Sequence, residues 1–201
     1  MAWTFILAHG FAFSDDYWHL LKNLLPGEVL FYQKNMATDS DANYVGVAHS
    51  LGFLRLNDSG IRFKYLFGLQ GFLDFCGKTE RLRRIRMQIL DRMIRSFSKN
   101  YEEGLREFYA RCSYTGETPL HLSKEALLDD LESLKKAYPH CGVSTMIIAS
   151  EDDPIVPRRV VEDNFLALPQ VEIKFTENCR HTMGHCHPEL IADIIRERLE
   201  H

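Results

Sequence analysis

Hydrophobic residues along the chain follow two kinds of pattern. Short apolar runs bounded by Gly, Pro or polar clusters are typical of buried strands, and apolar residues three or four positions apart are typical of helices. The runs predict six strands, at residues 4–8, 29–32, 44–48, 65–69, 143–149 and 171–175. The helical spacing predicts helices at residues 15–25, 50–56, 81–95, 103–112, 123–138, 160–166 and 188–199.

The order of these elements predicts the fold class. Strands alternate with helices over residues 1–70 and again over residues 140–201, which indicates a mostly parallel sheet flanked by helices. Residues 71–139 show the helical pattern alone. We therefore expect an α/β core of about six strands built from both ends of the chain, with residues 71–139 inserted as an α-helical cap within a single domain.

Composition narrows the class of protein. The chain of 201 residues is 45% hydrophobic and 26% charged, with a formal net charge of -4, which is typical of a globular domain and not of a nucleic-acid-binding protein. No apolar run approaches the roughly 20 residues that cross a bilayer. The five cysteines form no C-x-x-C pair, as is usual for free thiols in a reducing compartment. We expect a soluble, cytoplasmic protein with neither a membrane nor a nucleic-acid partner.

A candidate nucleophile lies between the strand at 44–48 and the helix that follows it. A nucleophilic serine is held on a sharp, strained turn, which is tolerated when the residues two before and two after it are small. Ser50 has Ala48 and Gly52 at these positions. The helix that begins at Ser50 directs backbone N–H groups and the positive end of its dipole at the reacting oxygen. The alternative is a serine that only caps a helix.

Two further segments supply a candidate acid and a candidate base. Asp152 and Asp153 follow the strand at 143–149, where either carboxylate can orient a histidine. His181, His185 and His187 follow the strand at 171–175, and any of these imidazoles titrates in the range that a general base needs. The alternatives are a solvated acidic turn and surface histidines without a role. Residue chemistry alone leaves both choices open.

The loop after the first strand reads His9-Gly10-Phe11-Ala12. Such a loop can place the backbone N–H of Phe11 opposite that of Leu51, and two convergent donors form an oxyanion hole. The alternative is a glycine turn after a buried strand. The order of the segments favours catalysis, because an HG loop, a serine turn, an acid and a histidine, each after an apolar strand, is the chain order of α/β-hydrolases.

The sequence resembles cap-bearing α/β-hydrolases over nearly its whole length, and among them the pimeloyl-[acyl-carrier-protein] methyl ester esterases of biotin synthesis. Those proteins have an H-G-aromatic loop with a further aromatic residue after it, matched by residues 9–11 and Trp18. Their G-H-S-L-G turn is matched by residues 48–52, with Ala48 in place of the first glycine. Their acid lies in a G-x-x-D-x-h-V-P segment (h is apolar), and their base precedes an H-P pair by six residues. By resemblance, these spacings select Asp153 and His181.

The resemblance implies a reduced α/β-hydrolase fold that begins at the third of the usual eight strands. It also implies a serine carboxylesterase that acts on pimeloyl-[acyl-carrier-protein] methyl ester without a metal or an organic cofactor. The alternative is an acyl thioesterase or a general small-ester hydrolase. We expect Phe11, Leu51 and Phe108 to contact the substrate. One departure is Ala12, where the family often has glycine.

A basic segment lies within the predicted cap. Residues 78–99 contain eight basic and two acidic residues, a local charge of +6 in a protein of net charge -4. One interpretation is a docking site for an acidic acyl carrier protein at Arg81, Arg84, Arg86 and Arg92. The other is a solvated helix face whose arginine stems cover apolar residues. Nucleic acid is disfavoured because no aromatic platform accompanies the charge.

Two other classes of function compete with a serine hydrolase. The segment 179–187 is dense in Cys and His, but its spacing fits no usual zinc frame, so we expect no metal site. A non-enzymatic binding module on a hydrolase fold is the second rival. Ser, Asp and His at all three expected places argue against it. Ser50 at the turn, where dehalogenases and epoxide hydrolases have Asp, also argues against their chemistry.

Overall fold

The core of the protein is one parallel sheet. The computed structural model describes residues 2–119 and 122–200, and its strands lie in the order β2-β1-β3-β4-β5-β6, each parallel to its neighbour. The strands are β1 (Trp3–Ala8), β2 (Gly27–Phe31), β3 (Tyr44–His49), β4 (Phe63–Leu69), β5 (Thr145–Ser150) and β6 (Val171–Thr176). The expected fold class, a six-stranded parallel sheet flanked by helices, is confirmed.

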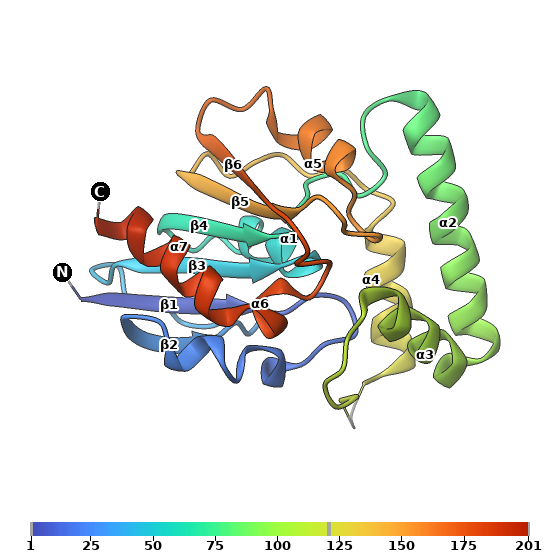
Figure 1. Ribbon diagram of the computed structural model, residues 1–201, viewed down its shortest axis with the longest axis horizontal. Coiled ribbons are helices and arrows are strands. Elements are labelled where there is room, and N and C mark those ends of the chain that lie inside the picture. Colours follow the sequence, from blue (N-terminus) through green and yellow to red (C-terminus); the bar gives the residue numbers. More distant parts are fainter. Residues whose placement is uncertain (1, 120–121, 201) are drawn as a thin grey trace.

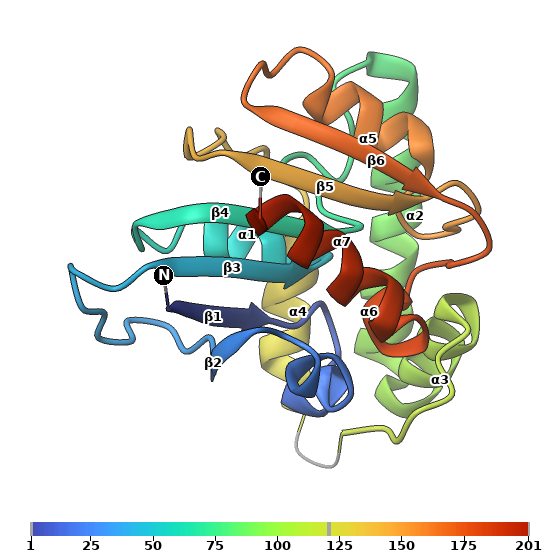
Figure 2. The same ribbon diagram turned by 60° about the vertical axis from the view of Figure 1, so that its left-hand side comes forward.

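Helices cover both faces of the sheet, which explains why its central strands β3 and β5 are buried along their whole length. All six residues of β3 and of β5 are buried, as in other parallel sheets that carry helices on each side. Helix α7 (Pro188–Glu200) and the short α6 (Met183–Cys186) lie on one face, and α1 (Leu51–Asn57) lies on the other (Figure 2). Helix α5 (Arg158–Phe165) shares the α1 face, because Phe165 packs edge-to-face on Phe53.

Three helices from the middle of the chain lie beyond the carboxyl ends of the strands (Figure 1). They are α2 (Glu80–Lys99), α3 (Tyr101–Cys112) and α4 (Lys124–Ser133). Loops that follow parallel strands open toward this end of the sheet, where α/β proteins build their sites. None of the helices in the described residues is long and apolar enough to cross a membrane.

Two predicted helices differ from the observed structure. Residues 15–25 form two 3-10 turns, Asp15–Trp18 and Leu21–Asn23, and not one α-helix. Trp18 and Leu21 are fully buried, and their spacing of three residues matches the three-residue turn of a 3-10 helix. The helix predicted at 123–138 ends at Ser133, because the chain turns over residues 134–136 and Ala137 then pairs with Asp74.

The outgoing and returning connections of these helices lie side by side. Asp74 and Ala137 form an antiparallel bridge, and the Tyr138 N–H donates to the Leu73 carbonyl at 2.9 Å. The fully buried Asn164 of α5 accepts from the N–H groups of Leu73 and Asp74 at 2.7 and 2.6 Å. Helices α2–α4 are therefore attached to the core through two paired segments that α5 holds in place.

Candidate active site

Ser50 lies on a strained turn between β3 and α1. Its backbone has φ 53° and ψ −120°, in a region that residues with a side chain rarely adopt. Gly52 permits this turn, because a Cβ there would lie 2.2 Å from the Ala8 carbonyl oxygen. Ala48 fits on the other side because its neighbours on the adjacent strands are small, namely Ala8 on β1 and Gly68 on β4. The departure from glycine at position 48 is thus accommodated by the sheet itself.

His181 and Asp153 form a buried pair. Nδ1 of His181 lies 2.8 Å from Oδ2 of Asp153, and the two residues are 1% and 3% exposed. The other carboxylate oxygen accepts the N–H groups of Ile155 at 2.7 Å and Val156 at 3.1 Å. Because a carboxylate in these bonds can only accept, Nδ1 carries the proton and Nε2 is left as the basic nitrogen.

The acid and base candidates left open by residue chemistry are separated by the structure. Asp152 does not contact His181; it accepts from the Ser150 hydroxyl and from the Arg180 N–H. Burial alone would raise the pKa of Asp152, but these hydrogen bonds outweigh it and lower the pKa. The ring of His185 lies 5.4 Å from that of His19 and 6.1 Å from that of Tyr17, and it makes no bond to Asp153 among the described residues. Asp153 is therefore the carboxylate bonded to His181.

The loop after β1 packs directly against the Ser50 turn. A Cβ on Gly10 would lie 2.8 Å from Nδ1 of His49 and 3.1 Å from the Ser50 Cβ, so a side chain there would displace the His49 ring or the Ser50 turn. Leu51 is the first residue of α1, and N–H groups in the first turn of a helix have no partner within it. Phe11 donates no hydrogen bond from its N–H to any described residue. The loop and the helix end are thus adjacent, as an oxyanion hole requires; the role of these two donors stays a prediction.

Solved structures share this architecture over the whole chain. An esterase from Exiguobacterium antarcticum is similar with a TM-score of 0.77 at 13% sequence identity, covering 100% of this chain and 92% of that chain. The chain has the α/β-hydrolase fold. An epoxide hydrolase from Bacillus megaterium (TM-score 0.73, 12% identity, covering 100% and 94%) and MenH from S. aureus (0.65, 12%, covering 98% and 93%) are similar in the same way. No protein-family model and no curated protein sequence matches the chain.

The α/β-hydrolase fold alone does not determine which reaction a protein catalyses. The similar structures include an esterase, an epoxide hydrolase and a bromoperoxidase from Bacillus anthracis, all below 15% identity. The chemistry must therefore be read from the residues at the carboxyl ends of the strands. In this chain they are the serine after β3, the Asp after β5 and the His after β6.

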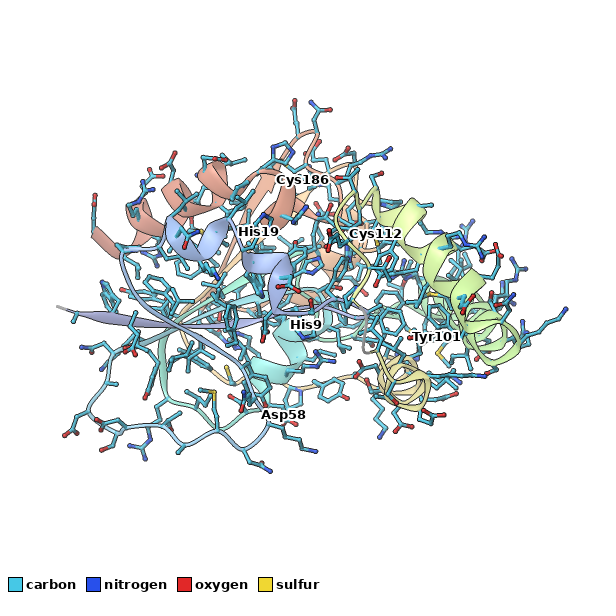
Figure 3. The ribbon with its side chains drawn as sticks, turned by 90° about the horizontal axis from the view of Figure 1, so that it is seen from below. His9, His19, Asp58, Tyr101, Cys112 and Cys186 are labelled. Atoms are coloured by element: carbon cyan, nitrogen blue, oxygen red, sulfur yellow. The ribbon has the colours of Figure 1, made fainter. Side chains whose placement is uncertain are left out.

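Helices α2 and α3 pack against the loop that follows β1. Ser50 is 5% exposed, and the Phe11 ring packs edge-to-face on Phe97 of α2 at 5.4 Å and on Phe108 of α3 at 5.0 Å. The Tyr109 hydroxyl donates to the carbonyl of Ala12, which adopts φ 60°. In Figure 3, His9 lies where the core meets α3, whose ends are marked by Tyr101 and Cys112. Helices α2 and α3 thus contact the same loop that carries the predicted Phe11 donor.

The prediction that Arg86 belongs to an exposed docking site is wrong. Arg86 is 6% exposed, and its guanidinium lies 4.0 Å from the centroid of the Phe75 ring. It donates from Nε to the Phe75 carbonyl at 3.1 Å and from Nη2 to the Ile155 carbonyl at 2.8 Å. Burial lowers the pKa of Arg86 to about 10, so it remains charged at neutral pH. Arg86 therefore ties α2 to the loop of Asp153, whereas Arg81, Arg84 and Arg92 are exposed.

Two buried residues of the site have no counterpart in the sequence-based prediction. Gln70, at φ 54°, donates from Nε2 to the Arg180 carbonyl at 2.7 Å. His49 lies 2.9 Å, through Nε2, from the carbonyl oxygen of His181. Gln70 follows the end of β4, and His49 is the last residue of β3. A polar residue at the end of a buried strand is the feature of the sequence that could have indicated a role for each.

The Cys- and His-rich segment does not gather its side chains around one point. His181 faces Asp153, and the ring of His185 faces that of His19. Cys179 is buried and Cys186 is exposed. Across residues 2–119 and 122–200, no group of three His, Cys, Asp or Glu side chains is arranged to hold a metal ion.

Proposed function

We propose that the protein is a serine hydrolase that cleaves carboxyl esters. The observation that carries this proposal is the buried His181–Asp153 pair, bonded at 2.8 Å, beside a serine in a strained backbone conformation. The His49 and His181 rings lie 4.8 Å apart, which places the histidine loop next to the Ser50 turn. Within the described residues Ser50 makes no hydrogen bond to His181, and in enzymes of this kind that bond often forms only with substrate present.

The proposed reaction proceeds through an acyl-enzyme. The Ser50 Oγ bonds to the ester carbonyl carbon while Nε2 of His181 takes its proton, and the carbonyl oxygen becomes an oxyanion. The carbon–oxygen bond to the alcohol then breaks, and His181 returns the proton to the departing oxygen. Water repeats the sequence, releasing the acid and restoring Ser50. Asp153 keeps the His181 tautomer correct, and the N–H groups of Phe11 and Leu51 stabilise the oxyanion.

A fluorophosphonate probe tests this proposal directly, because it labels only activated serines. We expect the wild-type protein to be labelled at Ser50 and to hydrolyse p-nitrophenyl butyrate. Ser50→Ala should abolish both, whereas Ser98→Ala, at an exposed position of α2, should retain both. Equal labelling of the Ser50→Ala and wild-type proteins would refute the serine-hydrolase proposal.

The finer proposal is that the substrate is pimeloyl-[acyl-carrier-protein] methyl ester. It rests on the resemblance of the catalytic segments and on the exposed face of α2. Arg81, Arg84 and Arg92 recur along that face with Arg95 and Lys99, and none of the five is paired with a described carboxylate. An acidic carrier protein is the kind of partner such a stripe would steer toward the site.

A cavity between α2 and α3 offers space for an acyl chain. It has a volume of about 340 Å³. Its apolar lining comes from Ile89, Met93, Phe97, Gly104, Phe108 and Ile155. Phe97 and Phe108 also contact the Phe11 ring, so they form the wall that the cavity shares with the oxyanion loop. We propose that the acyl chain reaches this cavity when the two rings move apart.

Charge reversal tests the carrier-docking proposal. Arg84→Glu should lower kcat/KM for the carrier-linked methyl ester by about tenfold and leave p-nitrophenyl butyrate unchanged. Arg62→Glu is the matched control, since Arg62 is exposed at the amino end of β4, away from the cap. Equal losses on both substrates would contradict docking. Faster turnover of the acyl thioester than of the methyl ester would favour the thioesterase alternative.

A further inference from the structure

His49 makes a direct contact with the loop of the proposed base. It is the last residue of β3, it precedes Ser50, and it is fully buried. Its Nε2 lies 2.9 Å from the carbonyl oxygen of His181, which is 132 residues away in the sequence. Because a carbonyl only accepts, Nε2 must carry the proton. Gln70 holds the preceding carbonyl, that of Arg180, at 2.7 Å. Two consecutive carbonyls of the loop are thus fixed by buried donors.

A second interaction holds the other end of the same loop. The His49 ring stacks on Tyr17, with centroids 4.4 Å apart and planes within 10° of each other. The Tyr17 hydroxyl accepts the N–H of Gly184 at 3.2 Å. His49 and Tyr17 therefore form a single stacked unit that bonds to the backbone at both His181 and Gly184.

The surroundings of His49 keep it neutral. Burial, and then the charge of nearby His181, hold the pKa of His49 well below its usual range; His9 acts in the same direction. Its Nδ1 is buried with no hydrogen-bond partner among the described residues. Gly10 lies against that nitrogen so closely that a Cβ there would be 2.8 Å away. The titratable groups that face His49 are thus His9, Tyr17 and His181.

We propose that His49 is a positioning residue for the His181 base. The Asp153 bond fixes one ring nitrogen of His181, but the ring is oriented only if its backbone is also fixed. The Nε2–H of His49 supplies that second point, and so sets where Nε2 of His181 meets the Ser50 hydroxyl. A misplacement of about 1 Å in such a site costs on the order of 100-fold in rate. This inference rests on the proposed serine-hydrolase function.

Two substitutions separate positioning from packing. His49→Phe keeps an aromatic ring on Tyr17 but removes the donor, and His49→Gln keeps a donor nitrogen in a side chain of similar length. We expect His49→Phe to lower kcat by 10- to 100-fold with KM little changed. His49→Gln should remain within about threefold of wild type. Wild-type kcat in His49→Phe, or equal losses in both folded variants, would overturn the proposal.

A measurement on the unmodified protein covers the case in which His49→Phe does not fold. Nitrogen-15 NMR should show His49 as the neutral Nε2–H tautomer from pH 5 to pH 8, and a His49 ring that titrates or is protonated on Nδ1 would overturn the proposal. Fluorophosphonate labelling then distinguishes failure of the proposed serine-hydrolase function from failure of the His49 positioning role. An unlabelled wild-type protein overturns the proposed function together with this inference. Labelling of wild type and His49→Phe at the same rate overturns the positioning role alone.

Discussion

Replacing Asp153 with Asn tests the proposed chemistry sharply, because the two side chains share a shape and differ in charge and hydrogen bonding. Oδ1 of Asp153 accepts the N–H groups of Ile155 at 2.7 Å and Val156 at 3.1 Å, and Oδ2 accepts from Nδ1 of His181 at 2.8 Å. In the variant the amide oxygen satisfies the two backbone donors, so the amide NH2 faces His181. The ring must then present an unprotonated Nδ1 and carry its proton on Nε2.

A His181 protonated on Nε2 cannot take the proton of Ser50. The same tautomer error in a Ser-His-Asp triad lowers kcat by about 10⁴-fold, which is roughly 5 kcal/mol of activation free energy. The cost in stability should be much smaller. Both backbone hydrogen bonds remain, so the variant loses the charge assistance of one buried bond, about 1–2 kcal/mol.

The assay is p-nitrophenyl butyrate hydrolysis at pH 7.5, with thermal unfolding measured in parallel. Asp152→Asn is the matched control, because the Asp152 side chain is 40% exposed and makes no bond to His181. We expect the control to stay within about threefold of wild type. If Asp153→Asn kept more than a tenth of the wild-type kcat while Asp152→Asn lost activity, the assignment of acid and base would be wrong.

Three further predictions concern the turn, the HG loop and the cap. Gly52→Ala places a methyl carbon 2.2 Å from the Ala8 carbonyl oxygen, so it should lower the free energy of unfolding by at least about 1–3 kcal/mol. The control is Gly60→Ala, whose methyl group would meet nothing within 4 Å, so it should cost only about 1 kcal/mol of backbone strain. Equal losses of stability in denaturant titrations would contradict the packing described for the Ser50 turn. Burial lowers the pKa of His9 to about 4. The unfolded chain then binds the proton first, so the free energy of unfolding should fall by up to about 3 kcal/mol as the pH drops from about 6.5 to about 4; a His9→Gln protein with the same pH dependence as wild type would count against this. Phe108→Ala opens the wall between the cavity and Phe11, and should raise kcat/KM for octanoyl relative to acetyl p-nitrophenyl esters several-fold; an unchanged acyl preference would contradict the proposed acyl path.

The core of the fold was predictable because its determinants are local. The buried strands β3 and β5 are apolar over most of their length. The turn at Ser50 requires small residues two positions before and after it, and Ala48 and Gly52 can be seen in the sequence itself. Residues 15–25 were wrongly predicted as one helix because spacings of three and four look alike in so short a segment. The packing of Trp18 and Leu21 decides between one α-helix and two 3-10 turns, and this packing cannot be seen in the sequence.

The site could be predicted only in part, for the same reason. Along residues 78–99 every arginine looks alike, and only the folded chain shows that Arg86 lies on Phe75 while Arg84 faces solvent. The contact of His49 with His181 spans 132 residues, so no local pattern indicates it. Contacts between distant loops are set by the topology of the sheet, which brings the carboxyl ends of its strands together.

The ties between helices α2–α4 and the loops after β1, β5 and β6 limit how this protein could be re-engineered. Arg86 bonds to the carbonyl two residues after Asp153, Tyr109 to the carbonyl beside Phe11, and Arg180 to the Ser113 hydroxyl. A chimera that exchanged residues 71–139 for the lid of another hydrolase would discard an anchor from each of these loops. Transplanting a new specificity would therefore require grafting the three anchors along with the helices.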